Sequence, residues 1–450
     1  MDLPKEYLNN MQKILQDDYP KYIDAMKNKP ISAMRINTTK ANADIAKYFD
    51  VTKKVFWAKN GYQIKSSKIG KHPYHIAGLV YVQEPSSMLA VASSGLEKET
   101  NKDDLCVLDL CVAPGGKTGQ IAEILDGKGV LVSNEIERKR ATVLLGNVER
   151  LGYKNVIITN ASPQKLSQDL TEMFDYVFVD APCSGEGMFR KNPETVLEWN
   201  KNLPEFNSQR QKQILSEANK MLKPGGKLVY STCTFSPKED EEIALWACQG
   251  LGYELQNLPK EVLENTTFLT NKKCRRFYPH IADGEGQFVC VLKKPCQKTE
   301  HYANKNSKKP KEESQKVINE YLKNTFELNF APIYTKIGEN WCLINEKLQK
   351  VMNLLKNTPI INAGVTVGSV QKDRIIPHNN MFMAYGNDAK NKLNLELDSK
   401  ELKKFLHGEE LENKSNFSGY VCIMSDGHSV GFAKASGTVL KNMFPKGLRI

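Results

Sequence analysis

Short apolar segments alternate with amphipathic segments from about residue 104 to about residue 294. The apolar segments read CVLDL, GVLVSNE, NVIITN, YVFVD, KLVYSTC and GQFVCVLKK, and each is long enough for one strand. Strands interleaved with helices favour a mostly parallel sheet that is covered by helices on both faces. The pattern therefore predicts a domain of the α/β class over residues 101–294.

Different patterns flank this domain. Residues 1–100 begin with a helical pattern, and the alternating stretch SAMRINTTK, Ser32–Lys40, then predicts a strand. Residues 317–450 begin with an amphipathic helix and become rich in strands. Within them, GYVCIMSDGHSVGFAKA predicts two strands joined around Asp426-Gly427.

A basic segment separates the α/β domain from the C-terminal region. Residues 293–316 hold eight lysines, three glutamates and almost no apolar side chain. Such a composition does not form a core, so we expect a solvated linker over residues 295–316. An arm that follows RNA is the alternative interpretation.

Composition narrows the class of protein. The 63 basic and 52 acidic residues give a net charge of +11, which favours a polyanionic partner, although a merely basic soluble surface would give the same charge. The chain has no uninterrupted apolar run of about 18 residues and begins without a signal-peptide pattern, so we expect a soluble, cytoplasmic protein. Its ten cysteines form no CxxC pair and do not cluster with the histidines, so we expect neither a disulfide framework nor a metal site.

The segment VLDLCVAPGGKTGQIAEIL, Val107–Leu125, predicts a strand, a glycine turn and a helix, with a ligand at the carboxyl end of the strand. It contains neither the GxGxxG of dinucleotide sites nor the GxxxxGK[ST] of phosphate loops. Gly115 and Gly116 allow backbone amides to approach a ligand closely. The next strand ends at Glu135, where an acid can accept hydrogen bonds from both ribose hydroxyls of a nucleoside cofactor. This pocket suits S-adenosylmethionine, although Glu135 could also be an ordinary acid at a helix entry.

Two further strand ends carry cysteines. Asp180 and Cys183 follow YVFVD, and Cys233 ends KLVYSTC. Between them, MLKPGGKLVY predicts a helix end, a Pro-Gly-Gly turn and an entering strand. If the two strands are neighbours in the sheet, both thiols face one cleft beside the cofactor. Each cysteine alone would more often be a buried structural thiol.

This pair of cysteines indicates a particular chemistry. Enzymes that methylate exocyclic amines commonly have Asp/Asn-Pro-Pro-aromatic where this chain has Asp180-Ala181-Pro182-Cys183. Carbon 5 of a pyrimidine is a poor nucleophile until a thiolate adds to carbon 6, and an acid near nitrogen 3 stabilises the charge that develops. A base must later remove the carbon 5 proton.

The segment SPKEDEEIALWACQG follows Cys233 and predicts a capped helix that starts at Ser236 and Pro237. A helix N-terminus favours a nearby thiolate, whereas the acids of that first turn oppose it.

Four motifs together, DLCVAPGGKT, SNEIERKR, VDAPCSGEGMFRK and YSTCTFSPKEDE, resemble the Sun/nucleolar-protein family of RNA cytosine-5 methyltransferases. The long form CSGEGMFRK and the tail LKNMFPKGLR resemble its bacterial branch, the ribosomal RNA small-subunit methyltransferases F. The resemblance implies a Rossmann-like S-adenosylmethionine-dependent core, an N-terminal RNA-binding part with MRINT and YVQEPSSM, and a small C-terminal β-rich domain similar to the PUA fold.

The resemblance also assigns residue roles. It implies that Cys233 is the nucleophile, that Cys183 helps release the product, and that Asp180 contacts both cofactor and target base. It implies cofactor contacts from Cys111, Val112, Ala113, Pro114, Gly115, Gly116, Lys117, Glu135, Arg140 and Asp180. Many relatives have an acid near the adenine after the third strand, where this chain has TNASPQ with Asn160 and Ser162.

These observations lead to one function and two alternatives. We expect a monomeric enzyme that methylates carbon 5 of a cytidine in ribosomal RNA, in the 16S RNA of the small subunit, through a Cys233 adduct. The alternatives are the same chemistry on transfer RNA and a non-catalytic ribosome-assembly factor. For the arginines Arg35, Arg275 and Arg276, an RNA contact and a structural salt bridge are equally expected, and Lys441, Lys446 and Arg449 are expected near the surface.

Overall fold

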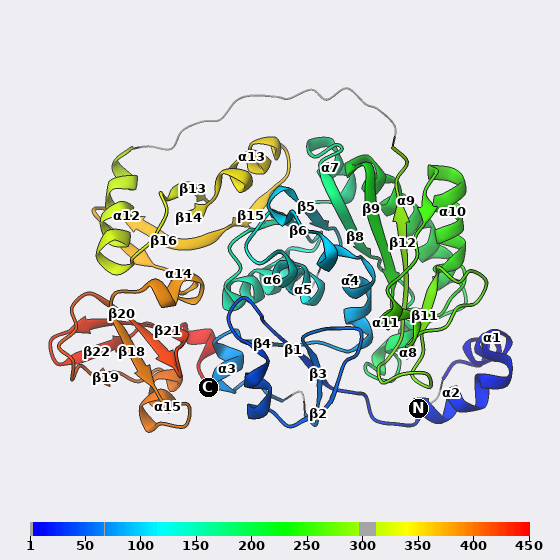
Figure 1. Cartoon of the computed structure of the whole chain (residues 1–450), viewed down its shortest axis with the longest axis horizontal. Coiled ribbons are helices and arrows are strands. Elements are labelled where there is room, and N and C mark those ends of the chain that lie inside the picture. Colours follow the sequence, from blue (N-terminus) through cyan, green and yellow to red (C-terminus); the bar gives the residue numbers. More distant parts are fainter. Residues whose placement is uncertain (1–2, 67, 113, 297–311) are drawn as a thin grey trace.

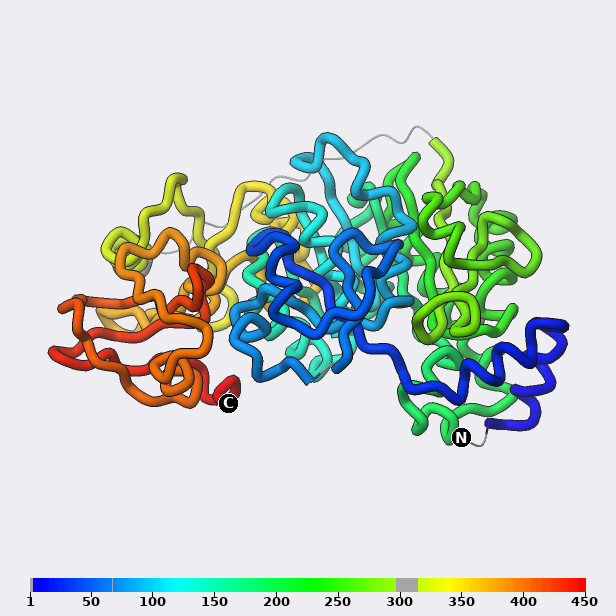
Figure 2. Tube along the Cα trace, turned by 60° about the horizontal axis from the view of Figure 1, so that its bottom comes forward, coloured from blue at the N-terminus to red at the C-terminus, as the bar shows by residue number. Residues whose placement is uncertain are grey.

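The computed structural model describes residues 3–66, 68–112, 114–296 and 312–450. A large sheet with its helices occupies the middle of the molecule, and the N-terminal helices and the C-terminal strands lie at opposite ends (Figures 1 and 2). Within the described ranges, no helix is long and apolar enough to cross a membrane.

The central sheet matches the alternating pattern of the sequence. Its strands lie in the order β10 (Glu254–Leu255), β12 (Gln287–Lys293), β9 (Leu222–Thr232), β8 (Phe174–Asp180), β5 (Cys106–Asp109), β6 (Val130–Asn134), β7 (Val156–Thr159) and β15 (Ile360–Ala363), and β11 (Arg275–Phe277) pairs with β12. Strands β9, β8, β5, β6 and β7 pair in parallel, and β12 and β15 join the sheet antiparallel. The predicted α/β class and the adjacency of the two cysteine-bearing strands are confirmed.

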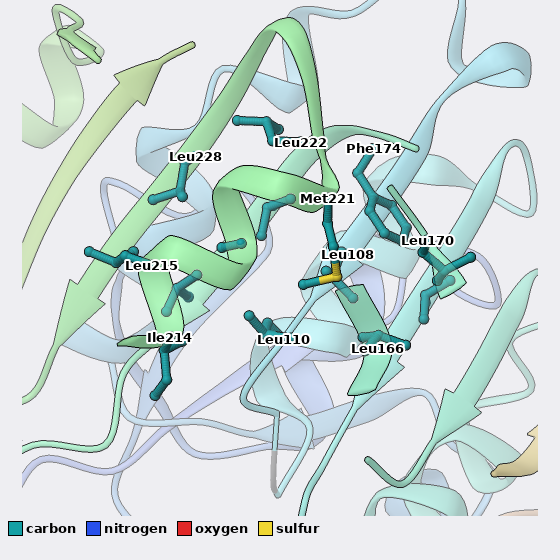
Figure 3. Close-up of a cluster of buried hydrophobic side chains, with 14 of the residues drawn as sticks. Leu108, Leu110, Leu166, Leu170, Phe174, Ile214, Leu215, Met221, Leu222 and Leu228 are labelled. Carbon is teal, nitrogen blue, oxygen red and sulfur yellow. The ribbon is translucent and has the colours of Figure 1, made fainter. Parts of the chain in front are cut away.

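Helices cover both faces of this sheet, which explains why the strands read as nearly continuous apolar runs. Side chains from α4 (Leu89–Ser93), α5 (Gly116–Leu125) and α6 (Arg138–Leu151) pack on one face. Figure 3 shows the opposite face, where Leu166 of α7 (Pro163–Asp169), Leu170 just after it, and Ile214, Leu215 and Met221 of α9 (Leu203–Met221) surround Leu108 and Leu110.

The N-terminal part has its own small sheet. Its strands lie in the order β2 (Val51–Lys54), β3 (Gly61–Ile64), β1 (Ala33–Ile36) and β4 (Val80–Val82), so a strand lies within the predicted stretch Ser32–Lys40. Ahead of it, α1 (Lys5–Leu15) and α2 (Tyr19–Met26) form a helical pair. Tyr7 and Tyr22 of this pair pack against Phe189, Trp199 and Phe235 of the central domain, so the N-terminal helices adjoin the loops that follow β8 and β9.

The C-terminal part contains two further sheets. The first has the order β13 (Ile333–Ile337), β14 (Asn340–Ile344), β16 (Val365–Gln371) and β17 (Arg374–Pro377); the second has the order β18 (Lys392–Leu395), β20 (Tyr420–Ser425), β21 (His428–Ser436), β22 (Val439–Asn442) and β19 (Leu411–Glu412). Ser425 pairs with His428, so Asp426 and Gly427 form a two-residue turn with φ of 46° and 82°. This turn confirms the predicted hairpin, because positive φ at both positions matches the twist of the strands.

The predicted linker falls mainly outside the described residues. Its part 297–311 lies there, and helix α12 (Glu312–Thr325) begins within its last residues. The C-terminal part nevertheless contacts the central domain directly: β15 pairs with β7, and Asn380 Nδ2 of α14 (Asn379–Tyr385) donates to Glu149 O of α6 at 3.0 Å.

Two local predictions around Cys233 were wrong. The helix expected from Ser236 is α10 (Glu241–Leu251), which begins five residues later because the carboxyl groups of Glu239 and Asp240 turn into the protein interior. The expected Pro-Gly-Gly turn instead belongs to the start of β9, which begins directly after α9. There Gly225 has a φ of 77° and the register with β8 shifts, as in a bulge.

Candidate active site

The carboxyl ends of β5, β6, β8 and β9 meet at one edge of the sheet. Asp109 of β5 pairs in register with Phe178 of β8, and Asp180 of β8 with Ser231 of β9. Parallel strands place the residues that follow them on the same side. This edge therefore brings together the predicted cofactor loop, Asp180 and both cysteines.

Asp180 is held by three side chains. Its Oδ2 lies 2.7 Å from Lys117 Nζ of α5, and its Oδ1 accepts hydrogen bonds from Ser231 Oγ at 2.7 Å and Gln287 Nε2 at 3.1 Å. The side chain is 32% exposed, so the carboxylate is fixed and still accessible to solvent. Sequence reasoning missed Gln287, because only the antiparallel pairing of β12 with β9 brings this residue to the site.

The two cysteines lie against each other. Cys183 Sγ and Cys233 Sγ are 3.3 Å apart, and both are free thiols. The hydrogen-bond contact with Cys233, together with burial, raises the pKa of Cys183. Cys183 therefore keeps its proton and can donate it toward the sulfur of Cys233, which leaves Cys233 as the sulfur better suited to attack.

Backbone contacts lock the Cys183 loop (residues 181–187) to the Cys233 loop (residues 233–240). Gly187 N donates to Cys233 O at 2.9 Å, and a Cβ on Gly187 would come within 2.9 Å of Gly286 Cα. Glu186 Oε2 accepts a hydrogen bond from Phe235 N at 3.1 Å. Close approach thus explains Gly187 and loop-to-loop bonding explains Glu186 of the CSGEGMF motif, whereas Gly185 has a positive φ of 70°.

The cofactor loop runs from Cys111 to Lys117, and Ala113 within it lies outside the described residues. Val112 N donates to Asn134 O at 3.3 Å, and Pro114 O accepts from Asn147 Nδ2 at 3.0 Å. Gly115 has a φ of 107°, and a Cβ there would lie 2.9 Å from Leu144 Cδ1. Gly116 opens α5. Burial raises the pKa of Cys111, so this cysteine stays a neutral thiol.

Two carboxyl groups border this loop. Glu135, at the end of β6, is 3% exposed; its Oε1 accepts from Glu137 N at 3.0 Å, and its Oε2 lies 3.7 Å from Arg140 Nε. Asp109 Oδ2 accepts from Thr118 Oγ1 at 2.8 Å, whereas Asp109 Oδ1 has no hydrogen-bond partner among the described residues. The glycine turn, the helix start and an acid at the next strand end fit a nucleoside cofactor such as S-adenosylmethionine.

Asn160 and Ser162 follow β7, at the position where the resemblance implies an acid near the adenine. Asn160 Nδ2 donates to the carbonyl oxygens of Glu135 and Ile136 at 2.7 and 2.9 Å. Ser162 caps α7 by accepting from Lys165 N at 3.3 Å. Both side chains therefore have structural contacts of their own, and Asn160 fixes the backbone of Glu135.

For three arginines the sequence left open an RNA contact or a structural salt bridge, and all three make contacts within the protein. Buried Arg35 pairs with Glu123 and donates from Nη2 to Gly116 O at 3.2 Å, which connects β1 to the first turn of α5. Arg276 is buried between Asp240 and Glu241. Arg275 Nε donates to Thr266 Oγ1 at 2.9 Å.

Three family models match the chain. The model described as 16S rRNA methyltransferase RsmB/F matches residues 96–293, the N-terminal domain of 16S rRNA methyltransferase RsmF matches residues 3–85, and the methyltransferase RsmF PUA domain matches residues 392–450. Together they cover both flanks and the catalytic core.

Individual relatives agree. The chain is 32% identical over 408 residues to ribosomal RNA small subunit methyltransferase F of Shewanella piezotolerans, covering 87% of this chain and 84% of the relative. It is 28% identical to the protein of the same name from Vibrio cholerae, covering 100% and 98%.

Solved structures resemble the chain as well. A methyltransferase homolog protein from Pyrococcus horikoshii is 28% identical with a TM-score of 0.54, over 65% of this chain and 95% of that one. NSun6 from the same organism, solved with SFG, has a TM-score of 0.55 at 20% identity over 65% and 98%, and supports the fold alone.

The matches and the geometry agree on the cofactor and on the class of enzyme. The cofactor is S-adenosylmethionine, and the glycine turn at Gly115 and the buried carboxyl group of Glu135 are of the kind that fits it. The matches extend over the N-terminal part, the core and the C-terminal β-rich domain. The chain belongs to the RsmB/F family of 16S rRNA methyltransferases, in the branch of ribosomal RNA small subunit methyltransferase F.

Proposed function

We propose that this enzyme methylates carbon 5 of a cytidine in 16S ribosomal RNA through a covalent adduct on Cys233. The observation that carries the proposal is the thiol pair, with 3.3 Å between Cys183 Sγ and Cys233 Sγ. Methylation of an exocyclic amine or a ribose hydroxyl needs no such pair, whereas carbon 5 needs a nucleophile at carbon 6 and a second group for release.

The first step is attack by Cys233. Its thiolate adds to carbon 6 of the ring, and the electron pair of the carbon 5–carbon 6 double bond becomes available at carbon 5. Asp180 is fixed by Ser231, Gln287 and Lys117. In this proposal it faces nitrogen 3 of the ring and stabilises the charge that develops there. When bound, S-adenosylmethionine supplies the electrophilic methyl group that carbon 5 takes.

Release reverses the addition. A base removes the carbon 5 proton, the double bond forms again, and the bond between carbon 6 and Cys233 Sγ breaks. The largest cause of the raised pKa of Cys183 is its hydrogen bond with Cys233. Once Cys233 is bound to the cytosine ring as a thioether, it no longer raises the pKa of Cys183, so Cys183 gives up its proton more readily than before and its thiolate can accept the carbon 5 proton. This order makes Cys183 a base only after attack.

The substrate follows from the relatives and the charge. Proteins matched over nearly the whole chain are named ribosomal RNA small subunit methyltransferase F. A net charge of +11 suits an RNA partner. These observations support RNA of the small ribosomal subunit as the substrate, and we further propose that the enzyme acts in the cytoplasm as a monomer.

The covalent route is tested with cysteine variants. Cys183→Ala should accumulate a protein–RNA complex that resists denaturation, because attack proceeds and release does not. Cys233→Ala should give neither methylated RNA nor complex. The matched control is Cys248→Ala, which removes a half-buried thiol on α10. This variant should behave as the unmodified enzyme. Methylation by Cys233→Ala at the normal rate would exclude this mechanism.

Bisulfite sequencing of total RNA from cells with and without the gene identifies the substrate. We expect one or more cytidines of 16S RNA to lose protection in the absence of the gene. Lost protection only in transfer RNA would overturn the ribosomal assignment while retaining the chemistry. Protection that persists unchanged in all RNA, together with a ribosome-assembly defect, would favour a non-catalytic assembly factor.

A further inference from the structure

Glu239 lies under the two cysteines, between the end of β9 and the start of α10. Its side chain belongs to the SPKEDE segment, where sequence alone places it in an exposed first helical turn. In the structure the residue is fully buried, with 0% exposure. A carboxyl group buried there needs hydrogen-bond partners, because burial without them is costly in free energy.

The carboxyl group holds the Cys183 loop on both sides of the thiol. Ser184 N donates to Glu239 Oε2 at 2.9 Å, and Ser184 Oγ donates to Glu239 Oε1 at 2.5 Å. Gln211 Nε2 of α9 donates both to Glu239 Oε2 and to Pro182 O, each at 3.0 Å. The carboxyl group therefore binds Ser184, after Cys183, directly, and is connected to Pro182, before Cys183, through Gln211.

Glu239 itself belongs to the Cys233 loop, and the network extends to the residue that follows Cys233. Ser184 Oγ and Thr234 Oγ1 are 2.6 Å apart, so the residue after each cysteine belongs to a single hydrogen-bonded network. Tyr230 OH donates to Glu239 O at 2.6 Å, which fixes the backbone of Glu239 against β9. The network spans both loops without touching either sulfur.

We propose that Glu239 is a positioning residue that holds the Cys183 thiol beside Cys233, so that its loss slows the release of methylated RNA. The proposal deepens the proposed function, on which its catalytic consequence rests. The thiol pair itself is a property of the free protein and is measured without RNA.

A glutamine at this position separates positioning from charge. In Glu239→Gln, the amide oxygen still accepts from Ser184 N and Gln211 Nε2, and the amide nitrogen donates to Ser184 Oγ, whose proton turns toward Thr234 Oγ1. The network therefore survives with the hydroxyl reversed. Glu239→Ala removes every side-chain contact. We expect the glutamine variant to resemble the unmodified enzyme and the alanine variant to be impaired.

The first test measures the thiol pair directly. Diamide takes two electrons and two protons from neighbouring thiols, becomes the hydrazine and leaves a disulfide, for which the sulfurs close from 3.3 Å to about 2.05 Å. Peptide mapping follows the Cys183–Cys233 bond over time. We expect Glu239→Ala to form it about 10-fold more slowly than the unmodified protein and Glu239→Gln to match the unmodified protein.

The matched control is Glu205→Gln. It breaks an exposed ion pair with Lys238, the neighbour of Glu239, at 2.7 Å and leaves the buried network intact, so the disulfide should form at the normal rate. Ser184→Ala removes one hydroxyl and retains the backbone bond, so it provides a milder change if Glu239→Ala does not fold. If Glu239→Ala forms the disulfide at the same rate as the unmodified protein, the positioning role is overturned. Ser184→Ala replaces it in this comparison if Glu239→Ala does not fold.

The second test follows release. With RNA and S-adenosylmethionine, Glu239→Ala should transfer methyl groups in a single turnover at a near-normal rate and release RNA about 10–100-fold more slowly, as a displaced catalytic group predicts. Glu239→Gln should restore release. Normal release by the alanine variant refutes the proposal. If instead Cys183→Ala forms no complex, Cys183 is not needed for release, and the diamide rates alone decide the role of Glu239.

Discussion

Asp109 makes the stability of the free enzyme depend on pH. It ends β5 directly ahead of the cofactor loop and is fully buried. Its Oδ2 accepts from Thr118 Oγ1, but its Oδ1 has no partner among the described residues. Burial raises the pKa of Asp109 from its ordinary value of 3.8 to about 7, even though Thr118 and Lys117 favour the charged form.

The direction and size of the change in stability with pH follow from the linkage between proton binding and folding. A native state whose carboxyl group has the higher pKa binds its proton more tightly than the unfolded chain, so this stability is complete below pH 3.8 and is lost as the pH rises toward 7. With about 1.4 kcal/mol for each pKa unit, the whole loss is about 4 kcal/mol. Of this, about 2–3 kcal/mol falls between about pH 5 and pH 8.

Asp109→Asn removes the titration and keeps an acceptor for Thr118. We compare the free energies of unfolding in urea, without cofactor, at about pH 5 and pH 8. The difference between the variant and the unmodified protein should shift by about 2–3 kcal/mol in favour of the variant from the lower to the higher pH. Asp17→Asn, at an exposed position, is the control and should leave the pH dependence unchanged. Parallel pH profiles for Asp109→Asn and the unmodified protein would show that Asp109 stays ionised in the native state.

Three further substitutions test packing around the site. Gly286→Ala places a methyl group into the Phe235 ring, so urea unfolding should show a loss of about 1–3 kcal/mol and methyl incorporation should fall. Gly146→Ala, in α6 with open space around it, should instead raise the free energy of unfolding by roughly 0.5–1 kcal/mol without altering activity. Arg190→Met leaves the buried Glu285 carboxylate without the guanidinium 2.8 Å away and should cost about 3–5 kcal/mol in the same unfolding assay.

The features that sequence predicts well are local or follow from sheet geometry. The apolar segments give the strands, and parallel pairing places Asp180 and Cys233 at the same sheet edge. That the thiols meet depends on the Cys183 loop and the Cys233 loop, whose short motifs are rich in glycine, serine and acids. Strand pairing therefore predicts that Cys183 and Cys233 lie at the same edge of the sheet, whereas the contact between their sulfurs depends on the two loops.

What sequence missed depends on contacts between distant segments. Gln287 reaches Asp180 from a strand more than 100 residues further along the chain, and nothing in GQFVCVLKK marks its amide as part of the site. The acids after Cys233 fit a helix start locally, because acids favour that position. Glu239 leaves that pattern because Ser184 and Gln211 offer buried donors, and neither residue is near it in sequence.

The sequence predicts a linker ahead of the C-terminal part but not how that part contacts the central domain. The central sheet provides that contact. β15 is short and its partner β7 lies about 200 residues earlier, so its apolar run IINA carries no signal of the pairing. Without β15, β7 would be an edge strand with unpaired backbone groups. Pairing covers that edge and ties residues 360–363 to the sheet that carries Asp180. The C-terminal part is thus held against the β7 edge of the central sheet by main-chain hydrogen bonds.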